Sequence, residues 1–301
     1  MSPKWYGVFP AVTTKFKSDF SLDWAAMEKH IEAQIAAGVH GIIVLGSLGE
    51  NGSLTASEKQ EVLKLAVSVI KRHVPVLSGV AETTTMAACE FVERASKSGA
   101  DGFMVLPAMQ YVADRRETIT HLRAVAKASD KPIMIYNNPV SYRVDVTPEM
   151  FAELADEPKF VALKESSDDL RRLTDIRNLT GDRYQIFMGV DDLALESFVL
   201  GADGWVAGLV CAFPKETVAL FKLAKAGRIE EALKLYRWFM PLLHLDVSTK
   251  FVQNIKLAEA LAGLGTETVR PPRLPLVGEE RRRVEGLIQK ALATRAALPQ
   301  I

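Results

Sequence analysis

Phe160-Val-Ala-Leu-Lys164-Glu165-Ser166-Ser167 begins a stretch in which a short apolar run is followed by an amphipathic run over residues 168–179 and a second short apolar run at 185–189. Short apolar runs rich in β-branched and aromatic residues predict buried strands, whereas longer runs with apolar residues every three or four positions predict helices. A strand, a helix and another strand in this order are typical of a parallel sheet.

The same alternation continues in both directions along the chain. We expect strands at residues 8–14, 41–45, 74–80, 101–106, 132–137, 160–164, 185–189 and 204–206. We expect helices at 22–37, 57–72, 84–98, 114–129, 148–154, 168–179, 191–200 and 215–225. These units average about 27 residues each, which predicts an α/β fold of the (β/α)8 TIM-barrel type.

Several helix ends are marked by residues with a clear physical role. Thr55-Ala-Ser-Glu58 predicts a capping box, in which the threonine oxygen and the glutamate satisfy free backbone amides at the helix start. Gly38, Gly99, Gly201 and Gly227 follow predicted helices, where a residue in the left-handed conformation often ends the helix.

After Gly227 the pattern contains helices only, at 229–245, 250–261 and 279–294. We therefore predict a barrel domain at residues 1–226 and a C-terminal helical region at 227–301. The cluster of large apolar residues at 238–243 is too apolar for an exposed helix, so this region is expected to pack on the barrel or on another subunit.

Composition excludes several classes of protein. The 301 residues include 37 basic and 37 acidic side chains, so no net charge attracts nucleic acid or anionic lipid. No signal-peptide pattern and no run of about 18 apolar residues occurs, which predicts a cytoplasmic protein without a membrane span. Cys89 and Cys211 are predicted to be buried free thiols, and the five histidines show no metal-ligand spacing.

In a parallel barrel the reactive groups lie at the carboxyl ends of the strands. Lys164 ends the sixth predicted strand, where burial would lower its pKa and make the neutral amine available to attack a carbonyl or imine carbon. The alternative is a structural lysine that reaches solvent or pairs with Glu165 or Asp168. Spacing alone leaves both interpretations open.

Four other strand ends carry residues that bear on the site. Tyr136 ends the fifth strand, and its phenol would relay protons to a Schiff-base intermediate unless it is simply a tyrosine at the barrel rim. Gly46-Ser47-Leu48-Gly49-Glu50 follows the second strand and offers backbone amides for a carboxylate, or else only a tight turn. Glycines at the ends of strands seven and eight could hold a phosphate, but Asp191 and Asp192, which follow the seventh strand, would repel it.

Together, the loop at residues 46–50, Tyr136-Asn137-Asn138-Pro139 and Lys164 resemble, in order and spacing, the motifs of the N-acetylneuraminate lyase and dihydrodipicolinate synthase family. The resemblance extends from about Gly7 to the C-terminal helices. It implies a barrel with C-terminal helices, usually a homotetramer, in which Lys164 and Tyr136 are catalytic, the substrate is a small molecule and no cofactor or metal is used. It also implies that Gly46, Ser47 and Leu48 bind the carboxylate of a 2-oxo acid.

The chain departs from the synthase pattern in its proton relay. In the synthase both middle positions of the glycine loop are usually threonine, and one of them joins a relay with the strand-five tyrosine and a tyrosine from a neighbouring subunit. Here Leu48 has no hydroxyl, and residues 106–111 lack the paired tyrosines expected after Pro107. Tyr111 is the candidate replacement.

A second departure concerns substrate charge. The synthase carries an arginine shortly after its tyrosine motif to hold the carboxylate of aspartate semialdehyde. Ser141 stands at about that place, and Arg143 lies two residues further on. Because a guanidinium that binds a carboxylate through two hydrogen bonds is hard to replace, this departure argues against synthase activity.

The runs 136–140, 164–169 and 189–192 most resemble the branch of Δ1-pyrroline-4-hydroxy-2-carboxylate deaminases, which act in hydroxyproline breakdown. This resemblance implies that Lys164 opens a cyclic imine, that water is lost, and that hydrolysis gives ammonia and 2-oxoglutarate semialdehyde. Asn138, Ser141 and Val206 are then expected to contact the rest of the substrate.

Other activities would use the same lysine and tyrosine. They are a pyruvate-dependent aldolase, a 2-keto-3-deoxy sugar acid dehydratase or aldolase, and 4-hydroxy-tetrahydrodipicolinate synthase. A non-catalytic ligand-binding barrel is the remote alternative.

Overall fold

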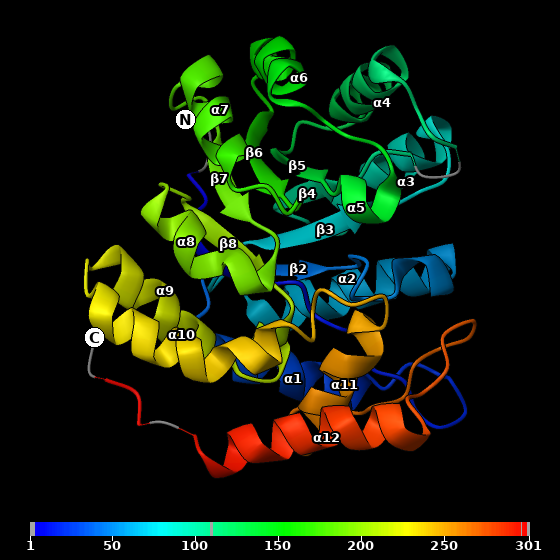
Figure 1. Cartoon of the computed structure of the whole chain (residues 1–301). Coiled ribbons are helices and arrows are strands. Elements are labelled where there is room, and N and C mark those ends of the chain that lie inside the picture. Colours follow the sequence, from blue (N-terminus) through cyan, green and yellow to red (C-terminus); the bar gives the residue numbers. More distant parts are fainter. Residues whose placement is uncertain (1–3, 109–110, 296, 300–301) are drawn as a thin grey trace.

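A computed structural model describes residues 4–108, 111–295 and 297–299, and within them eight parallel strands form one sheet. The strands are β1 (Gly7–Pro10), β2 (Ile42–Val44), β3 (Val76–Val80), β4 (Gly102–Val105), β5 (Ile133–Asn137), β6 (Phe160–Glu165), β7 (Gln185–Met188) and β8 (Gly204–Ala207). Their order is β1-β8-β7-β6-β5-β4-β3-β2, and a bridge between Ala11 and Ile43 brings the two ends of the sheet together. The predicted TIM barrel is thereby confirmed (Figure 1).

Helices cover the outside of the barrel between successive strands (Figure 1). They are α1 (Trp24–Ala36), α2 (Ala56–Ile70), α3 (Thr85–Lys97), α4 (Arg115–Lys127), α5 (Pro139–Tyr142), α6 (Pro148–Glu153), α7 (Arg171–Thr180), α8 (Ala194–Val199) and α9 (Pro214–Lys225). The sequence pattern missed only α5 among these, because a single helical turn is too short to show a helical period.

The predicted helix signals are present in the structure. Thr55 and Glu58 form the capping box at the start of α2. Gly38, Gly99, Gly201 and Gly227 all have positive φ, between 74° and 97°. The first predicted strand, however, is shorter than expected: after Pro10 the amide of Ala11 donates to Ala207 of β8, whereas that of Val12 donates to Ile43 of β2. This change of partner closes the barrel.

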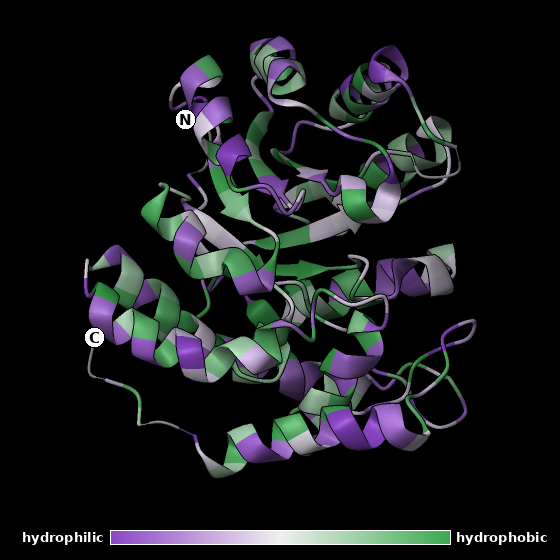
Figure 2. Cartoon of the chain, viewed as in Figure 1, coloured by the Kyte–Doolittle hydropathy of each residue, from purple (hydrophilic) through white to green (hydrophobic). Residues whose placement is uncertain are grey.

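Two apolar clusters hold the fold together. One fills the barrel interior and includes Phe9, Leu77, Met104, Met134 and Phe187, which are almost completely buried. A larger cluster lies between the strands and the surrounding helices. Figure 2 shows the same division, with apolar residues concentrated in the strands and polar residues on the outer helices. Cys211 is buried as predicted, but Cys89, on the outer helix α3, is only half-buried.

The C-terminal helices are α10 (Ile229–Leu243), α11 (Phe251–Leu261) and α12 (Gly278–Ala293), and α12 packs against the other two (Figure 1). Phe239 of α10 is buried and contacts the ring of Phe213, at 5.9 Å between centroids, so the apolar cluster packs on the barrel. None of the helices in the described ranges has both the length and the hydropathy needed to cross a membrane. The division of the chain at residue 227 stays a prediction.

Candidate active site

A cavity of about 210 Å³ lies at the carboxyl ends of the strands. Lys164 and Tyr136 line it, as do the other predicted contact residues Gly46, Ser47, Leu48, Asn138, Ser141 and Val206. The structure therefore brings together every residue that the sequence assigned to the site. Residues 246–248, Phe251 and Arg273 of the C-terminal region also line it, and no sequence pattern had indicated them.

Lys164 lies in β6 and is only 7% exposed. Its Nζ is 4.1 Å from the centre of the Tyr136 ring, on the neighbouring strand. No ion pair joins it to a carboxylate within the described residues. Glu165 does not serve as a partner, because it bonds instead to Asn137 Nδ2 at 3.2 Å and to the Ser167 amide at 2.8 Å.

Burial lowers the pKa of Lys164, because an ammonium loses solvation inside the protein; negative charge on Asp246 and Asp191 acts in the opposite direction. Between the two interpretations left open by the sequence, the geometry fits the nucleophile. A lysine that reached solvent would be more exposed, and a paired lysine would have a carboxylate beside its amine.

Tyr136 is 5% exposed, and its hydroxyl accepts a hydrogen bond from Asn138 Nδ2 at 3.1 Å. Burial raises its pKa, opposed by hydrogen bonding to Asn138 among others. A phenol that keeps its proton beside an amine of lowered pKa is suited to passing a proton to and from an intermediate on that amine.

Tyr142 is the main site residue that the sequence analysis missed. It is the last residue of α5, and its ring packs edge-to-face against Tyr136 with centroids 5.6 Å apart. Its hydroxyl hydrogen-bonds to Ser47 Oγ and also interacts with the Tyr136 hydroxyl. A chain of hydroxyls therefore runs from Ser47 through Tyr142 to Tyr136. Its sequence signal was an aromatic residue three positions after Pro139, which places it at the end of the turn that follows β5.

Neither residue considered as a replacement for a family position lines the cavity of its own chain. Tyr111 is 81% exposed, and its role as a relay tyrosine supplied to a neighbouring subunit stays a prediction. Its neighbours Met109 and Gln110 fall outside the described residues. Arg143 ends α5 in the left-handed conformation, with φ of 60°, and is exposed outside the cavity. Ser141, by contrast, lines the cavity.

Two carboxyl groups lie near Lys164. Asp191 is fully buried and accepts from Trp205 Nε1 at 2.9 Å and from the Leu209 amide at 2.8 Å, so it holds the turn after β8. Burial raises its pKa to about 6, opposed by these hydrogen bonds. Asp191 is not among the residues that line the cavity, so its charge acts on the site from behind the cavity wall, and the repulsion of a phosphate stays a prediction. Asp246 does line the cavity, and burial raises its pKa strongly.

Two glycines make room for these groups. A Cβ atom on Gly189 would lie 2.0 Å from Ser166 Oγ and 2.5 Å from Lys164 Cε. A Cβ atom on Gly208 would lie 2.1 Å from Asp246 Oδ1. Both distances are far below contact, so any other residue at either position would displace a side chain of the site.

Glu50, in the glycine loop, uses both of its carboxylate oxygens to bind the C-terminal region. Its carboxylate bonds to Lys256 Nζ at 2.6 Å and to the Arg270 amide at 3.0 Å. The loop that carries Ser47 and Leu48 is thereby fixed to the C-terminal region.

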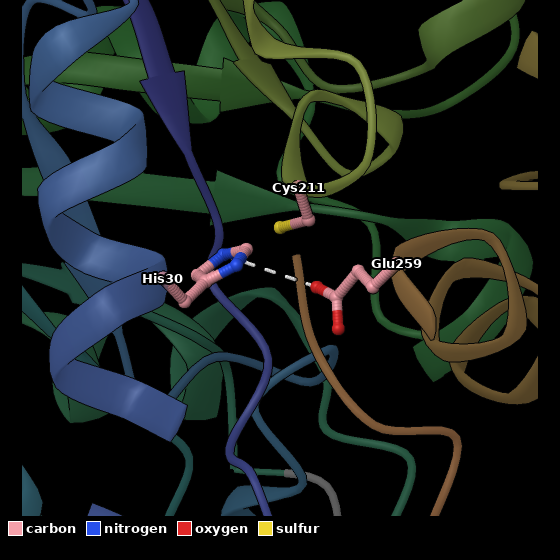
Figure 3. A group of neighbouring side chains, drawn as sticks. All are labelled: His30, Cys211 and Glu259. Carbon is pink, nitrogen blue, oxygen red and sulfur yellow. Dashed lines mark ion pairs between the residues drawn. The ribbon is translucent and has the colours of Figure 1, made fainter. Parts of the chain in front are cut away.

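A second group of reactive side chains lies apart from the cavity: His30, Cys211 and Glu259 place potential ligand atoms within 4.8 Å of one another (Figure 3). The ammonium of Lys15 already bonds to Glu259 at 2.6 Å and to Thr13. Burial raises the pKa of the Cys211 thiol and lowers that of His30 to about 4. Lysine thus supplies the positive charge that a metal ion would bring, and the thiol keeps its proton. The group is an internal ion pair that ties the barrel to α11.

Comparison with known proteins finds relatives that match nearly the whole chain. Residues 4–291 match the model of the dihydrodipicolinate synthetase family. The chain is 30% identical over 285 residues to 4-hydroxy-tetrahydrodipicolinate synthase of Methanothrix thermoacetophila, covering 94% of this chain and 96% of the relative. It is 33% identical over 271 residues to the enzyme of the same name from Exiguobacterium sibiricum, covering 90% and 92%.

Solved structures show the same relationship. A dihydrodipicolinate synthase from Bacillus anthracis superposes with a TM-score of 0.91 at 27% identity, covering 96% of this chain and 99% of that one. A prophage protein of the dihydrodipicolinic acid synthase family from E. coli K12, in complex with pyruvate, gives 0.89 at 28% identity, covering 95% and 98%. Because these matches span nearly the whole chain, the protein belongs to the dihydrodipicolinate synthetase family, whose lyases form a covalent Schiff base through a lysine and need no cofactor.

Proposed function

We propose that Lys164 forms a Schiff base with the 2-oxo carbon of a small 2-oxo acid of the pyruvate type, and that the resulting enamine makes or breaks a carbon–carbon bond. The observation that carries this proposal is a buried amine of lowered pKa that lines the cavity without a carboxylate partner in the described chain. The pyruvate bound to the E. coli relative supports the substrate class.

The reaction would begin with attack of the neutral Lys164 amine on the carbonyl carbon. The oxygen takes up protons and leaves as water, giving the iminium. Loss of a proton from the adjacent carbon then yields an enamine, which attacks an aldehyde; the reverse sequence cleaves the bond. Tyr136 would move these protons, and the hydroxyls of Tyr142 and Ser47 would connect it to the other wall of the cavity.

The substrate carboxylate would lie against the glycine loop. Gly46, Ser47 and Leu48 line the cavity at the end of β2, where backbone amides and the Ser47 hydroxyl can donate to an anion. Leu48 needs no hydroxyl for this, because Tyr142 rather than a second loop hydroxyl continues the hydroxyl chain. Asn138, Ser141 and Val206 would contact the rest of the substrate.

The names of the relatives favour condensation of the enamine with an aldehyde, as 4-hydroxy-tetrahydrodipicolinate synthase is named for both sequence relatives described above. The second candidate is Δ1-pyrroline-4-hydroxy-2-carboxylate deaminase. It is favoured by one observation: Ser141 and Asn138 line the cavity, whereas Arg143 lies outside it. A neutral lining next to α5 suits the hydroxyl of this cyclic imine better than a second carboxylate. The cytoplasmic location and the tetramer stay predictions of the sequence.

The test is reduction of the purified protein with borohydride in the presence of pyruvate. We expect the mass to increase by one reduced pyruvate adduct, mapped to Lys164 by peptide analysis. Absence of an adduct at Lys164 would refute the proposal. A control without pyruvate must show no change in mass.

A panel of substrates separates the two candidates. Release of ammonia from the hydroxypyrroline carboxylate supports the deaminase. Consumption of pyruvate with an aldehyde, or release of pyruvate from a keto sugar acid, supports carbon–carbon bond chemistry.

A further inference from the structure

The C-terminal region forms part of the wall of the cavity. Asp246, Val247, Ser248, Phe251 and Arg273 all line it, together with the strand ends that carry Lys164 and Tyr136. Arg273 is the only arginine among the described lining residues. The site thus contains a permanent positive charge that comes from the C-terminal region and not from the barrel.

The guanidinium of Arg273 has no partner within the protein. No hydrogen bond or ion pair joins its side chain to any residue that the structure describes. Two other arginines of the C-terminal region are paired with carboxylates: Arg270 binds Glu58 at 2.9 Å, and Arg281 binds Glu267. Arg273 is also partly shielded from solvent. A half-buried guanidinium without a carboxylate, facing a cavity, is suited to an anionic ligand.

The backbone around Arg273 is held on both sides. Its amide donates to the carbonyl of Arg270 at 3.2 Å, and the Arg270 amide donates to Glu50 at 3.0 Å. Val269 and Leu276 are buried on either side of the turn, at 2% and 5% exposure. Glu50 also belongs to the loop that carries Ser47, so the turn and the loop are fixed to the same carboxylate.

The carboxyl groups that line the cavity do not neutralise the positive charge of the Arg273 guanidinium. The carboxyls that line the cavity are Asp168 and Asp246, and neither forms an ion pair with Arg273 in the described part of the chain. Burial raises the pKa of both, and the nearby charge of Asp192 adds to the effect at Asp168 and at Asp246. Both carboxyls therefore keep a proton to higher pH than an exposed aspartate does.

We propose that Arg273 binds a second carboxylate at the far end of the substrate or adduct held on Lys164. The favoured substrates are then 2-oxo acids with two carboxylates, one against the glycine loop and one on the planar guanidinium, which can bind it through two hydrogen bonds. This inference rests on the proposed Schiff-base chemistry and deepens its first candidate. The cyclic imine of the deaminase has one carboxylate and would not use Arg273.

The experiment compares three acids as partners for borohydride trapping at Lys164: pyruvate, 2-oxoglutarate and 2-oxopentanoate. The last two have the same number of carbons and differ in the second carboxylate. For the wild-type chain we expect half-maximal trapping at a concentration of 2-oxoglutarate about 10- to 100-fold lower than that of 2-oxopentanoate, as expected for a charge-assisted hydrogen-bonded pair.

Arg273→Gln should abolish this preference, while Arg273→Lys, which keeps the charge but not the planar fork, should retain part of it. Arg143→Gln is the matched control, because this arginine is exposed outside the cavity, and it should retain the full preference.

Each other result overturns a defined part of the argument. Equal trapping of the two five-carbon acids by the wild type, or a preference that survives in Arg273→Gln, refutes the role of Arg273. The Schiff-base proposal would not be affected by either result. Loss of the preference in Arg143→Gln refutes it as well. Failure to trap pyruvate refutes the Schiff-base proposal and, with it, the role of Arg273.

Discussion

Lys164 and Lys15 are both buried lysines, but their surroundings differ in one respect. The Lys15 amine lies 2.6 Å from the buried carboxylate of Glu259, and its side chain is 0% exposed. Lys256 repeats this arrangement with Glu50 at 2.6 Å. Lys164 instead faces the ring of Tyr136 and an open cavity. A buried ammonium that is paired serves structure, whereas an unpaired one beside a cavity is free to lose its proton and react.

The largest expected effect is on the unpaired lysine. Lys164→Met should lower the rate of turnover by about 10⁴-fold or more, because the nucleophile is removed and no other lysine lines the cavity among the described residues. Its free energy of unfolding should stay the same or rise, since a buried charge without an ion partner is replaced by an apolar side chain. Steady-state rates and urea unfolding measure the two quantities. Turnover that survives in this variant would contradict the role of Lys164.

Lys15→Met should instead lower stability and leave the reaction at Lys164 intact. It leaves the Glu259 carboxylate buried without its cation, so we expect a loss of about 3–5 kcal/mol in the free energy of unfolding. Trapping of pyruvate at Lys164 should persist at temperatures where the variant is folded. The double variant Lys15→Met/Glu259→Leu should recover part of the stability, because it removes both charges. A loss of trapping in the folded single variant would show that the two lysines are not independent.

Tyr142→Phe tests the hydroxyl chain beside Lys164. We expect kcat to fall about 10- to 100-fold with little change in KM, because the variant keeps the ring contact with Tyr136 and removes the hydroxyl that bonds to Ser47. Tyr111→Phe is the matched variant at an exposed position. If Tyr111→Phe lowers kcat and Tyr142→Phe does not, the relay passes through Tyr111 instead.

The fold was predictable because each of its units carries its own signal. Apolar runs such as 160–164 and 185–189 predict buried strands. Gly99 and Gly227 mark helix ends because they adopt positive φ, a backbone conformation that costs other residues free energy. The ends of these strands then converge in a barrel, so Lys164, Tyr136 and Ser47 could be placed in one site without any knowledge of side-chain contacts.

The rest of the site was not predictable, because it depends on contacts between distant segments and not on local sequence signals. Arg273 and Asp246 lie in the C-terminal region, and their approach to the cavity depends on how that region packs on the barrel, which no local pattern encodes. Tyr142 is close to Tyr136 in sequence, yet its position depends on the single turn of α5. The pairing of Lys15 with Glu259 joins residues 244 positions apart, and only the structure reveals it.

The smallest expected effect is a shift in the pH dependence of Schiff-base formation. It should respond to a carboxylate near Lys164 and not to the carboxylate paired with Lys15. The rate of Schiff-base formation with pyruvate should rise as pH increases through the pKa of Lys164, since only the neutral amine attacks, and its midpoint should lie below the ordinary lysine value because burial lowers this pKa. Asp246→Asn removes a carboxylate whose negative charge raises the pKa of Lys164, so the midpoint should move to still lower pH. Glu259→Gln, at the paired lysine, should leave the midpoint where it is. A midpoint that does not respond to Asp246→Asn would mean that this carboxyl carries no charge while Lys164 titrates and does not oppose the effect of burial on the pKa of Lys164.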